Sequence, residues 1–283
     1  MRPVQYITLI AAVALIAFLY WGGNTTPPPK KTTKSPAMAG GMSPGPNTVK
    51  PASFDSIINA SRRQLLPAAA DEVKTIENEL AAIRDSSQMA AVFLRLAHVW
   101  EKNKELPVAG FYSAKAAKLE KSRKMLNFAG QFFLERVNET TSQPVQQWEL
   151  DQAADCYQRA LDLDKDNDTA KIGLATIYVA TGETMKGVGM LRDITQKEPD
   201  NVPANMLLGR LSIQSGQLDK AITRFEQILK KEPGNVDAML YLAEAYEQKG
   251  QKEKALEIYQ QCKQLVNNPE FNRSIDQHIN SLK

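Results

Sequence analysis

Apolar residues in the stretch 202–235 fall into two stripes, each with the spacing of one face of an α-helix. Ala204, Leu208 and Leu211 stand at helical intervals and predict a first helix. A Ser-Gly pair follows, and glycine is the usual residue where a chain leaves a helix in the left-handed conformation. A second apolar stripe over 218–231 ends at Glu-Pro-Gly, because proline disfavours helix at the residue before it. The stretch therefore predicts a helical hairpin.

The same hairpin pattern occurs three times between residues 168 and 269, with a constant period of 34 residues. The residues that keep this period are Gly182, Gly216 and Gly250; Ala170, Ala204 and Ala238; Leu174, Leu208 and Leu242; and Pro199 and Pro233. A fixed period of about 20 to 50 residues is typical of repeat arrays, in which each unit packs against its neighbours. The first unit carries Gly187 and Gly189 inside a predicted helix, where glycine costs roughly 0.5–1 kcal/mol relative to alanine. We expect this unit to be the least stable of the three.

The repeat resembles the tetratricopeptide repeat (TPR), which alternates small and large residues between two helices. The matching positions are Leu208, Gly209, Ala221, Phe225 and Pro233 in one unit, and Leu242, Ala243, Tyr246, Ala255 and Tyr259 in the next. Two positions depart from the family pattern: Ser212 replaces a tyrosine, and Asn267 stands where the closing proline is expected. The resemblance implies an all-α fold, a right-handed superhelical solenoid of TPR helical hairpins that serves as a binding scaffold.

Weaker copies of the pattern flank the three TPR repeats at 168–269. Residues 53–89 predict leading helices, 90–167 predict degenerate TPR units, and 270–283 predict a C-terminal capping helix. In the first degenerate unit a lysine, Lys104, stands at the glycine position. The second degenerate unit is interrupted over 138–148, which we expect to form a surface loop. Such a loop either contacts a partner or is a tolerated insertion.

The segment 1–21 predicts a transmembrane anchor. Val4–Trp21 is an uncharged, mostly apolar run, and its helical length of roughly 27 Å approaches the hydrocarbon thickness of about 30 Å. A cleaved signal peptide is the competing interpretation, but no small-x-small cleavage site follows the run until Ala37-Met38-Ala39. Residues 22–52 are rich in proline and glycine and predict a disordered linker.

Basic residues flank the predicted anchor on both sides. Arg2 precedes it closely, while Lys30, Lys31 and Lys34 follow at a distance, so the positive-inside rule is nearly balanced. A first apolar segment with a short basic N-terminus commonly inserts with its C-terminal side outside the cytoplasm. We therefore expect a single-pass protein of the bacterial inner membrane with its repeats in the periplasm. An organelle-surface protein with its repeats in the cytosol is the alternative.

The sequence offers little catalytic or metal-binding chemistry. A formal net charge of +3 without a basic helix disfavours nucleic acid as a partner. The two histidines, His98 and His278, are 180 residues apart and no nucleotide-binding or hydrolase motif is present, so we expect no enzyme activity, cofactor or metal site. Cys156 and Cys262 predict buried small hydrophobes. The acidic run 162–168 resembles the start of a calcium loop without its glycine and glutamate, and we interpret it as an inter-repeat turn.

The family resemblance also implies where a partner binds. In TPR proteins the first helices line a concave groove, and their fifth, ninth and twelfth residues point into it. These positions are Ile172, Thr176 and Val179; Met206, Arg210 and Ile213; and Leu240, Glu244 and Glu247. They form an apolar strip with one arginine and two glutamates, which we expect to be exposed and to contact a protein or peptide. Packing of the apolar residues between helices is the alternative.

Together these features predict a membrane-anchored TPR scaffold that mediates protein–protein interaction, in envelope assembly or as a chaperone-like adaptor. The resemblance is to single-span periplasmic TPR proteins. Two alternatives remain open: a receptor-type TPR protein on an organelle surface, and an accessory subunit that positions a catalytic partner. Protease access to the repeats separates the first alternative from the prediction, and co-purification from solubilised membranes addresses the second.

Overall fold

The computed structural model describes residues 49–281, and within this range all regular secondary structure is α-helical. The helices are α2 (Phe54–Arg62), α3 (Pro67–Ala82), α4 (Ser86–Lys102), α5 (Leu106–Leu119), α6 (Arg123–Val137), α7 (Gln143–Leu163), α8 (Asp168–Ala180), α9 (Thr184–Lys197), α10 (Val202–Gln214), α11 (Leu218–Lys231), α12 (Val236–Gln248), α13 (Lys252–Val266) and α14 (Pro269–Ser281). The predicted anchor, and the predicted linker up to residue 48, lie outside the described residues. Between 49 and 281 no helix combines the length and apolar content needed to cross a bilayer.

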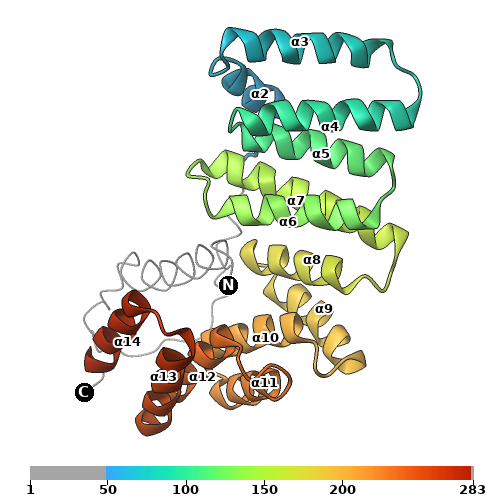
Figure 1. Cartoon of the computed structure of the whole chain (residues 1–283). Coiled ribbons are helices and arrows are strands. Elements are labelled where there is room, and N and C mark those ends of the chain that lie inside the picture. Colours follow the sequence, from blue (N-terminus) through green and yellow to red (C-terminus); the bar gives the residue numbers. More distant parts are fainter. Residues whose placement is uncertain (1–48, 282–283) are drawn as a thin grey trace, which may run out of the picture.

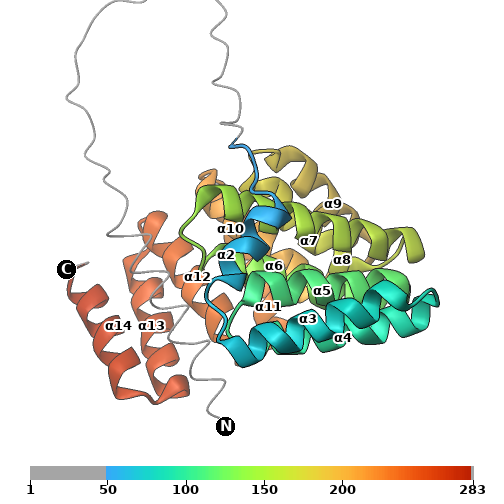
Figure 2. The same ribbon diagram turned by 90° about the horizontal axis from the view of Figure 1, so that it is seen from above.

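The helices pair into hairpins that stack one after another along the array (Figure 1). The pairs are α4–α5, α6–α7, α8–α9, α10–α11 and α12–α13, and the second helix of each pair also packs against the first helix of the next. At the ends of the array, α3 packs on α4, α14 packs on α13, and the short α2 lies against α5 (Figure 2). The predicted all-α array of helical hairpins is confirmed.

The turns inside four of the five hairpins use a residue in the left-handed conformation, and the exception is the turn between α6 and α7. The three periodic glycines there are Gly182, Gly216 and Gly250, with φ of 90°, 71° and 81°. Lys104 follows α4 with φ of 63°, so the degenerate unit keeps the turn geometry without glycine. Three later hairpins begin at an asparagine whose side chain accepts a hydrogen bond from a backbone amide in the first turn, which caps the helix. These asparagines are Asn167, Asn201 and Asn235.

Aromatic rings of the second helices fill the spaces that small residues leave. Tyr157 of α7 lies against Gly130 of α6 and Gly173 of α8, where an added Cβ would come within 2.8 and 2.3 Å of its ring. Phe225 of α11 lies in the same way against Gly209 of α10, at 2.6 Å. A side chain at any of these glycines would push two helices apart, so the small–large pattern of the sequence is a packing requirement.

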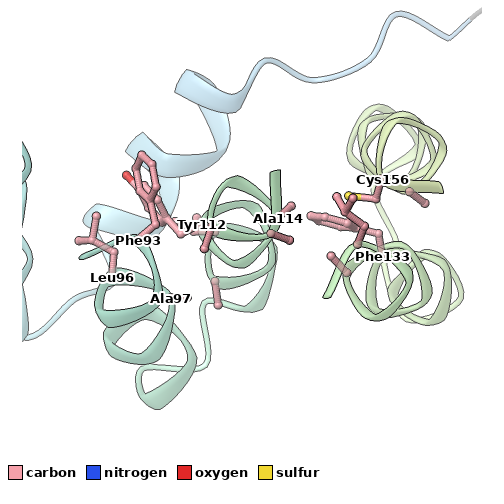
Figure 3. Packing of buried hydrophobic residues seen from close by; sticks show 14 of the residues in the cluster. Phe93, Leu96, Ala97, Tyr112, Ala114, Phe133 and Cys156 are labelled. Carbon is pink, nitrogen blue, oxygen red and sulfur yellow. The ribbon is translucent and has the colours of Figure 1, made fainter. Parts of the chain in front are cut away.

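The largest buried cluster extends from α2 to α8, and three smaller clusters continue the core to α14. Figure 3 shows part of the largest cluster, with Tyr112 of α5 beside Phe93 of α4, and Phe133 of α6 beside Cys156 of α7. Both cysteines are buried and free, as the sequence predicts. Burial raises the pKa of the Cys156 thiol to about 11, which keeps it protonated and unreactive.

The prediction of a surface loop over 138–148 is wrong for most of that segment. α7 begins at Gln143, so only residues 138–142 separate it from α6. Pro144 stands in the first helical turn, where its missing N–H costs no hydrogen bond because the first amides have no partner within the helix. The insertion therefore lengthens a helix.

The first turns of α7, which the insertion adds, contact the residues at the start of the folded chain. The backbone N–H of Ala52 donates to the carbonyl oxygen of Pro144 at 2.8 Å. Phe54 of α2 stacks on Phe111 of α5 with ring centres 3.6 Å apart, and lies 6.2 Å from the ring of Trp148. Trp148 is buried as a result. The insertion is thus covered by α2 of the same chain.

Two glycines of α9 provide a matched test of how closely this helix approaches α8. An added Cβ at Gly187 would lie 2.7 Å from the carbonyl oxygen of Ala175, whereas at Gly189 it would meet nothing within 4 Å. We expect Gly187→Ala to lower the free energy of unfolding by about 1–3 kcal/mol, because the two backbones must separate. Gly189→Ala should raise it by about 0.4–1 kcal/mol by restricting the unfolded chain. Urea unfolding measures both, and a stabilising Gly187→Ala would contradict the close approach.

Candidate protein-binding face

The nine positions implied by the TPR resemblance lie on α8, α10 and α12, the first helices of three successive hairpins. Within each helix they are four and then three residues apart, which puts them on one face. The three faces adjoin, because α8 contacts α10 and α10 contacts α12. Eight of the nine residues are half-buried, and we name these the candidate face. They are Ile172, Thr176, Val179, Met206, Arg210, Leu240, Glu244 and Glu247.

The ninth position, Ile213, is 7% exposed and belongs to the core. It stands near the end of α10, where the chain turns back, and it shares a buried cluster with Ala221 and Ile222 of α11. The expectation that all nine residues are exposed is therefore wrong at Ile213, and the other eight are only partly exposed. The position of Ile213 within its own helix could not show that α11 covers its side chain.

The apolar residues of the candidate face are embedded on one side and exposed on the other. Ile172, Met206 and Leu240 each pack against a different buried cluster while remaining partly accessible. The hydroxyl of Thr176 donates to the carbonyl oxygen of Ile172 at 2.9 Å, so it is satisfied within its own helix. Each of these apolar side chains therefore packs between helices on one side and can contact a ligand on the other.

The charged residues gather at the α10–α12 part of the face. The guanidinium of Arg210 lies over the ring of Tyr241, 5.4 Å from its centre. Glu244 accepts a hydrogen bond from the side-chain amide of Gln248 at 3.0 Å. Burial and the neighbouring Glu247 raise the pKa of Glu244, and Arg210 offsets only part of this rise. Glu244 is therefore a carboxylate that the protein leaves poorly compensated.

Glu247 has a different environment, because the capping helix supplies it with a partner. His278 Nε2 of α14 lies 2.8 Å from Glu247 Oε2, and the Tyr259 hydroxyl donates to the same oxygen at 3.2 Å. The contact with Glu247 raises the pKa of His278 and lowers that of Glu247. Sequence reasoning missed this pairing, although His278 follows Phe271 by seven residues and so shares the buried side of the predicted cap.

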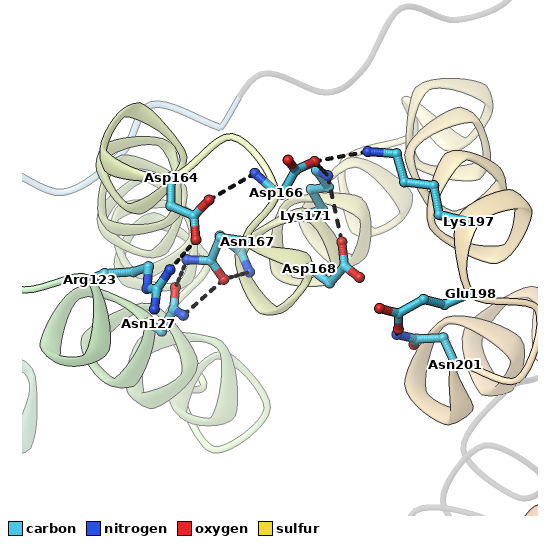
Figure 4. A network of polar contacts seen from close by, with 11 residues as sticks. Arg123, Asn127, Asp164, Asp166, Asn167, Asp168, Lys171, Lys197, Glu198 and Asn201 are labelled. Atoms are coloured by element: carbon cyan, nitrogen blue, oxygen red, sulfur yellow. Dashed lines mark hydrogen bonds and ion pairs between the residues drawn. The ribbon is translucent and has the colours of Figure 1, made fainter.

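The acidic run 162–168 forms the turn between α7 and α8, as the sequence interpretation proposed. Figure 4 shows its carboxylates facing cations: Asp164 pairs with Arg123, and Asp166 pairs with Lys197 at 2.8 Å. Asn127 and Asn167 exchange two side-chain hydrogen bonds of 3.1 Å, which tie α6 to the start of α8. These contacts join successive hairpins. Within residues 49–281 no group of three or more His, Cys, Asp or Glu side chains is placed to hold a metal ion.

Two open cavities lie at the other end of the array, along the seam between α3 and α4. Their volumes are about 720 and 530 Å³. Arg95 lines both cavities and pairs with Glu79 across the seam at 2.7 Å. Sequence analysis did not anticipate them, because the fit between α3 and α4 depends on packing that no local pattern reports.

Comparison with known proteins agrees with this architecture. Residues 145–211 and 212–272 match the family model for the tetratricopeptide repeat. Stacked helical hairpins with a partly exposed face on their first helices are typical of protein-interaction scaffolds. Residues 145–272 therefore contain tetratricopeptide repeats. A comparison with curated proteins gives no match.

Several solved structures are similar to this chain at low sequence identity. PilW, described as a widely conserved type IV pilus biogenesis factor, is 18% identical with a TM-score of 0.51, over 78% of this chain and 95% of PilW. A TPR protein from Parabacteroides merdae is 19% identical with a TM-score of 0.50, over 66% of this chain and 72% of that one. YrrB, described as a TPR protein with an unusual peptide-binding site, is 20% identical with a TM-score of 0.44, over 66% of this chain and 92% of YrrB.

The Glu247–His278 pair predicts a pH dependence for the attachment of α14. A raised His278 pKa means that its stabilising contribution is complete below the ordinary value near 6.5 and is lost as pH rises through the raised value. The lowered pKa of Glu247 means that its contribution is lost only as pH falls through that value. Amide exchange in α14 should therefore become faster, relative to the intrinsic rate, as pH rises above about 6.5 and through the raised pKa of His278.

Two variants test this assignment. His278→Gln should abolish the pH dependence of α14 protection, because glutamine does not titrate. Asp276→Asn removes the ion pair of α14 with Lys263 of α13, and should lower protection while keeping the pH dependence. A pH dependence that survives in His278→Gln would contradict the role of this pair.

Proposed function

We propose that this TPR protein is a membrane-anchored scaffold that binds a polypeptide through the candidate face, in the assembly of envelope components or as a chaperone-like adaptor. The observation that carries the proposal is the candidate face itself. Three adjoining helices present partly exposed apolar side chains beside Arg210 and Glu244, neither of which forms an ion pair within the described residues. Extended peptides bind such surfaces by covering apolar side chains while charged side chains fix the register.

One buried titratable group away from this face, Glu149, has a structural role. Glu149 is fully buried; it accepts hydrogen bonds from Arg136 at 3.0 Å and Thr140 at 2.8 Å, which fixes the short turn before α7. Burial raises the pKa of Glu149, and these two contacts offset only part of the rise. An ion pair of this kind holds two helices together and is inaccessible to a substrate. This favours a scaffold, and an accessory subunit that positions a catalytic partner remains an outcome of the binding test.

The anchor supports a location at the membrane surface. We propose that residues 1–21 span the bacterial inner membrane and that residues 22–52 connect them to repeats in the periplasm. The folded chain begins beside the start of α7, where Ala52 bonds to Pro144. The candidate face lies on other helices, α8, α10 and α12, so attachment and partner binding use different parts of the array.

Matched substitutions test the candidate face. Met206→Ala, Arg210→Ala and Leu240→Ala should each reduce recovery of the partner after cross-linking in intact cells and solubilisation of membranes. Residues at the centre of an interface commonly contribute about 2 kcal/mol or more. The same changes at exposed residues of second helices, Met185→Ala, Arg192→Ala and Leu265→Ala, should leave recovery unchanged. Melting temperatures should fall only slightly for the Met206 and Leu240 variants, whose side chains are half-buried.

The comparison separates binding from folding. Loss of partner in the face variants, with melting temperatures close to those of the controls, supports the proposal. Equal loss in both sets would place the partner elsewhere or reveal a general folding defect. Recovery of one catalytic subunit in stoichiometric amount would favour the accessory-subunit alternative.

The anchor proposal has its own test. The full chain should remain in the membrane pellet after alkaline carbonate washing, because an apolar run of about 18 residues inserts as a spanning helix. Protease added to spheroplasts should degrade the repeats, whereas in intact cells the outer membrane protects them. A mature protein that begins at Gly40 would contradict the anchor, and protection of the repeats in spheroplasts would place them in the cytosol.

A further inference from the structure

Arg210 and Glu244 occupy equivalent positions on neighbouring first helices, and neither forms an ion pair within the described part of the chain. Arg210 stands nine residues into α10 and lies over Tyr241. Glu244 stands nine residues into α12 and has the neutral Gln248 as its hydrogen-bond partner, while the charges of Arg210 and His278 act on it without forming an ion pair. The next carboxylate along, Glu247, already has its partner in His278. One cation and one anion of the candidate face are therefore available to a ligand.

The surroundings of Glu244 strengthen its electrostatic attraction to a cation. The side chain is half-buried, and burial together with Glu247 raises its pKa. A carboxylate that has lost part of its hydration gains more from a charged partner than one in open water does, because the effective dielectric constant is lower. Leu240 lies one turn away on the same face and Met206 on the adjoining helix, so an incoming side chain would meet apolar surface around its charged end.

We propose that the candidate face selects an extended peptide segment in which a lysine or arginine pairs with Glu244 and neighbouring apolar residues cover Met206 and Leu240. This inference rests on the proposed function, since it specifies the partner of the same face. The apolar stem and charged end of lysine or arginine match a carboxylate set among apolar side chains.

Arg210 determines which residues a bound peptide can place on α10, next to the basic residue at Glu244. Packed helices lie about 8–10 Å apart, and an extended chain advances about 3.3 Å per residue. A peptide that crosses from α12 to α10 therefore brings a residue about three positions from the basic one beside Arg210. At that place a second cation is repelled and an acidic or neutral residue is preferred.

The pairing also predicts a pH dependence of binding. The basic peptide side chain binds the ionised form of Glu244, whose pKa in the free protein is raised. Affinity should be constant at high pH and should fall as pH drops through that raised value, because the carboxylate must then lose a proton on binding. Replacement by glutamine should flatten this profile.

The test uses the full chain in lipid nanodiscs and a library of randomised twelve-residue peptides, acetylated and amidated to remove terminal charges. Peptides retained by the wild-type protein should be enriched in lysine or arginine at one position relative to the input library. Glu244→Gln should remove this enrichment and weaken the selected peptides by about tenfold or more, which corresponds to about 1.4 kcal/mol per factor of ten. Glu244→Lys should shift the preference to acidic residues.

Glu257→Gln, an exposed glutamate on α13, is the matched control and should leave selection unchanged. Glutamine is isosteric at position 244, and a melting curve verifies that the variant is folded. Should that variant unfold, the pH profile of wild-type binding gives an independent result, because a flat profile overturns the pairing. Enriched peptides without a basic preference, or with one that survives in Glu244→Gln, also overturn it and leave the proposed function intact. Retention no greater than on empty nanodiscs overturns both.

Discussion

The array depends on the close approach of helices at small residues, with an aromatic ring from the second helix filling the space between hairpins. Tyr157 lies between Gly130 of its own hairpin and Gly173 of the next. Phe225 also joins two hairpins, because it stacks on Tyr241 of the following one with ring centres 5.7 Å apart. Each ring thus belongs to two interfaces, and its removal would leave a gap in both. The stability of one unit is therefore coupled to that of its neighbours.

Because of this packing, the two sides of each first helix differ in which residues they can carry. One side meets the rings of the second helices and is restricted to small and apolar residues. The other side has no such restriction, and equivalent positions there carry Thr176, Arg210 and Glu244. The differences between these three residues give the face a pattern of charge along the array without changing the fold. Specificity in a repeat scaffold lies in such positions, because the scaffold itself is common to proteins with unrelated partners.

The ends of the array are covered by helices that do not follow the repeat pattern. At the N-terminal side, Phe54 of α2 docks on the rings of Phe111 and Trp148, which covers the lengthened start of α7. At the C-terminal side, α14 buries Phe271 and places His278 against Glu247 of the candidate face. Capping of this kind prevents end-to-end stacking of copies. It also places a titratable group, His278, in the contact with the last hairpin.

The sequence by itself determined the repeat, its hairpin turns and the faces of its helices, because period and helical spacing are local properties of the chain. It even located the turn at Lys104, which takes the left-handed conformation of the missing glycine. Only the tertiary structure decided which residues other helices cover. Ile213 has the spacing of a face residue, yet the returning α11 buries it. Proline is common in loops, but it is equally acceptable in a first helical turn, and Pro144 in that turn accepts a hydrogen bond from Ala52, which precedes α2. The pairing of Glu247 with His278 joins residues 31 apart on different helices, so its existence depends on how α14 packs and could not be inferred from spacing within either helix.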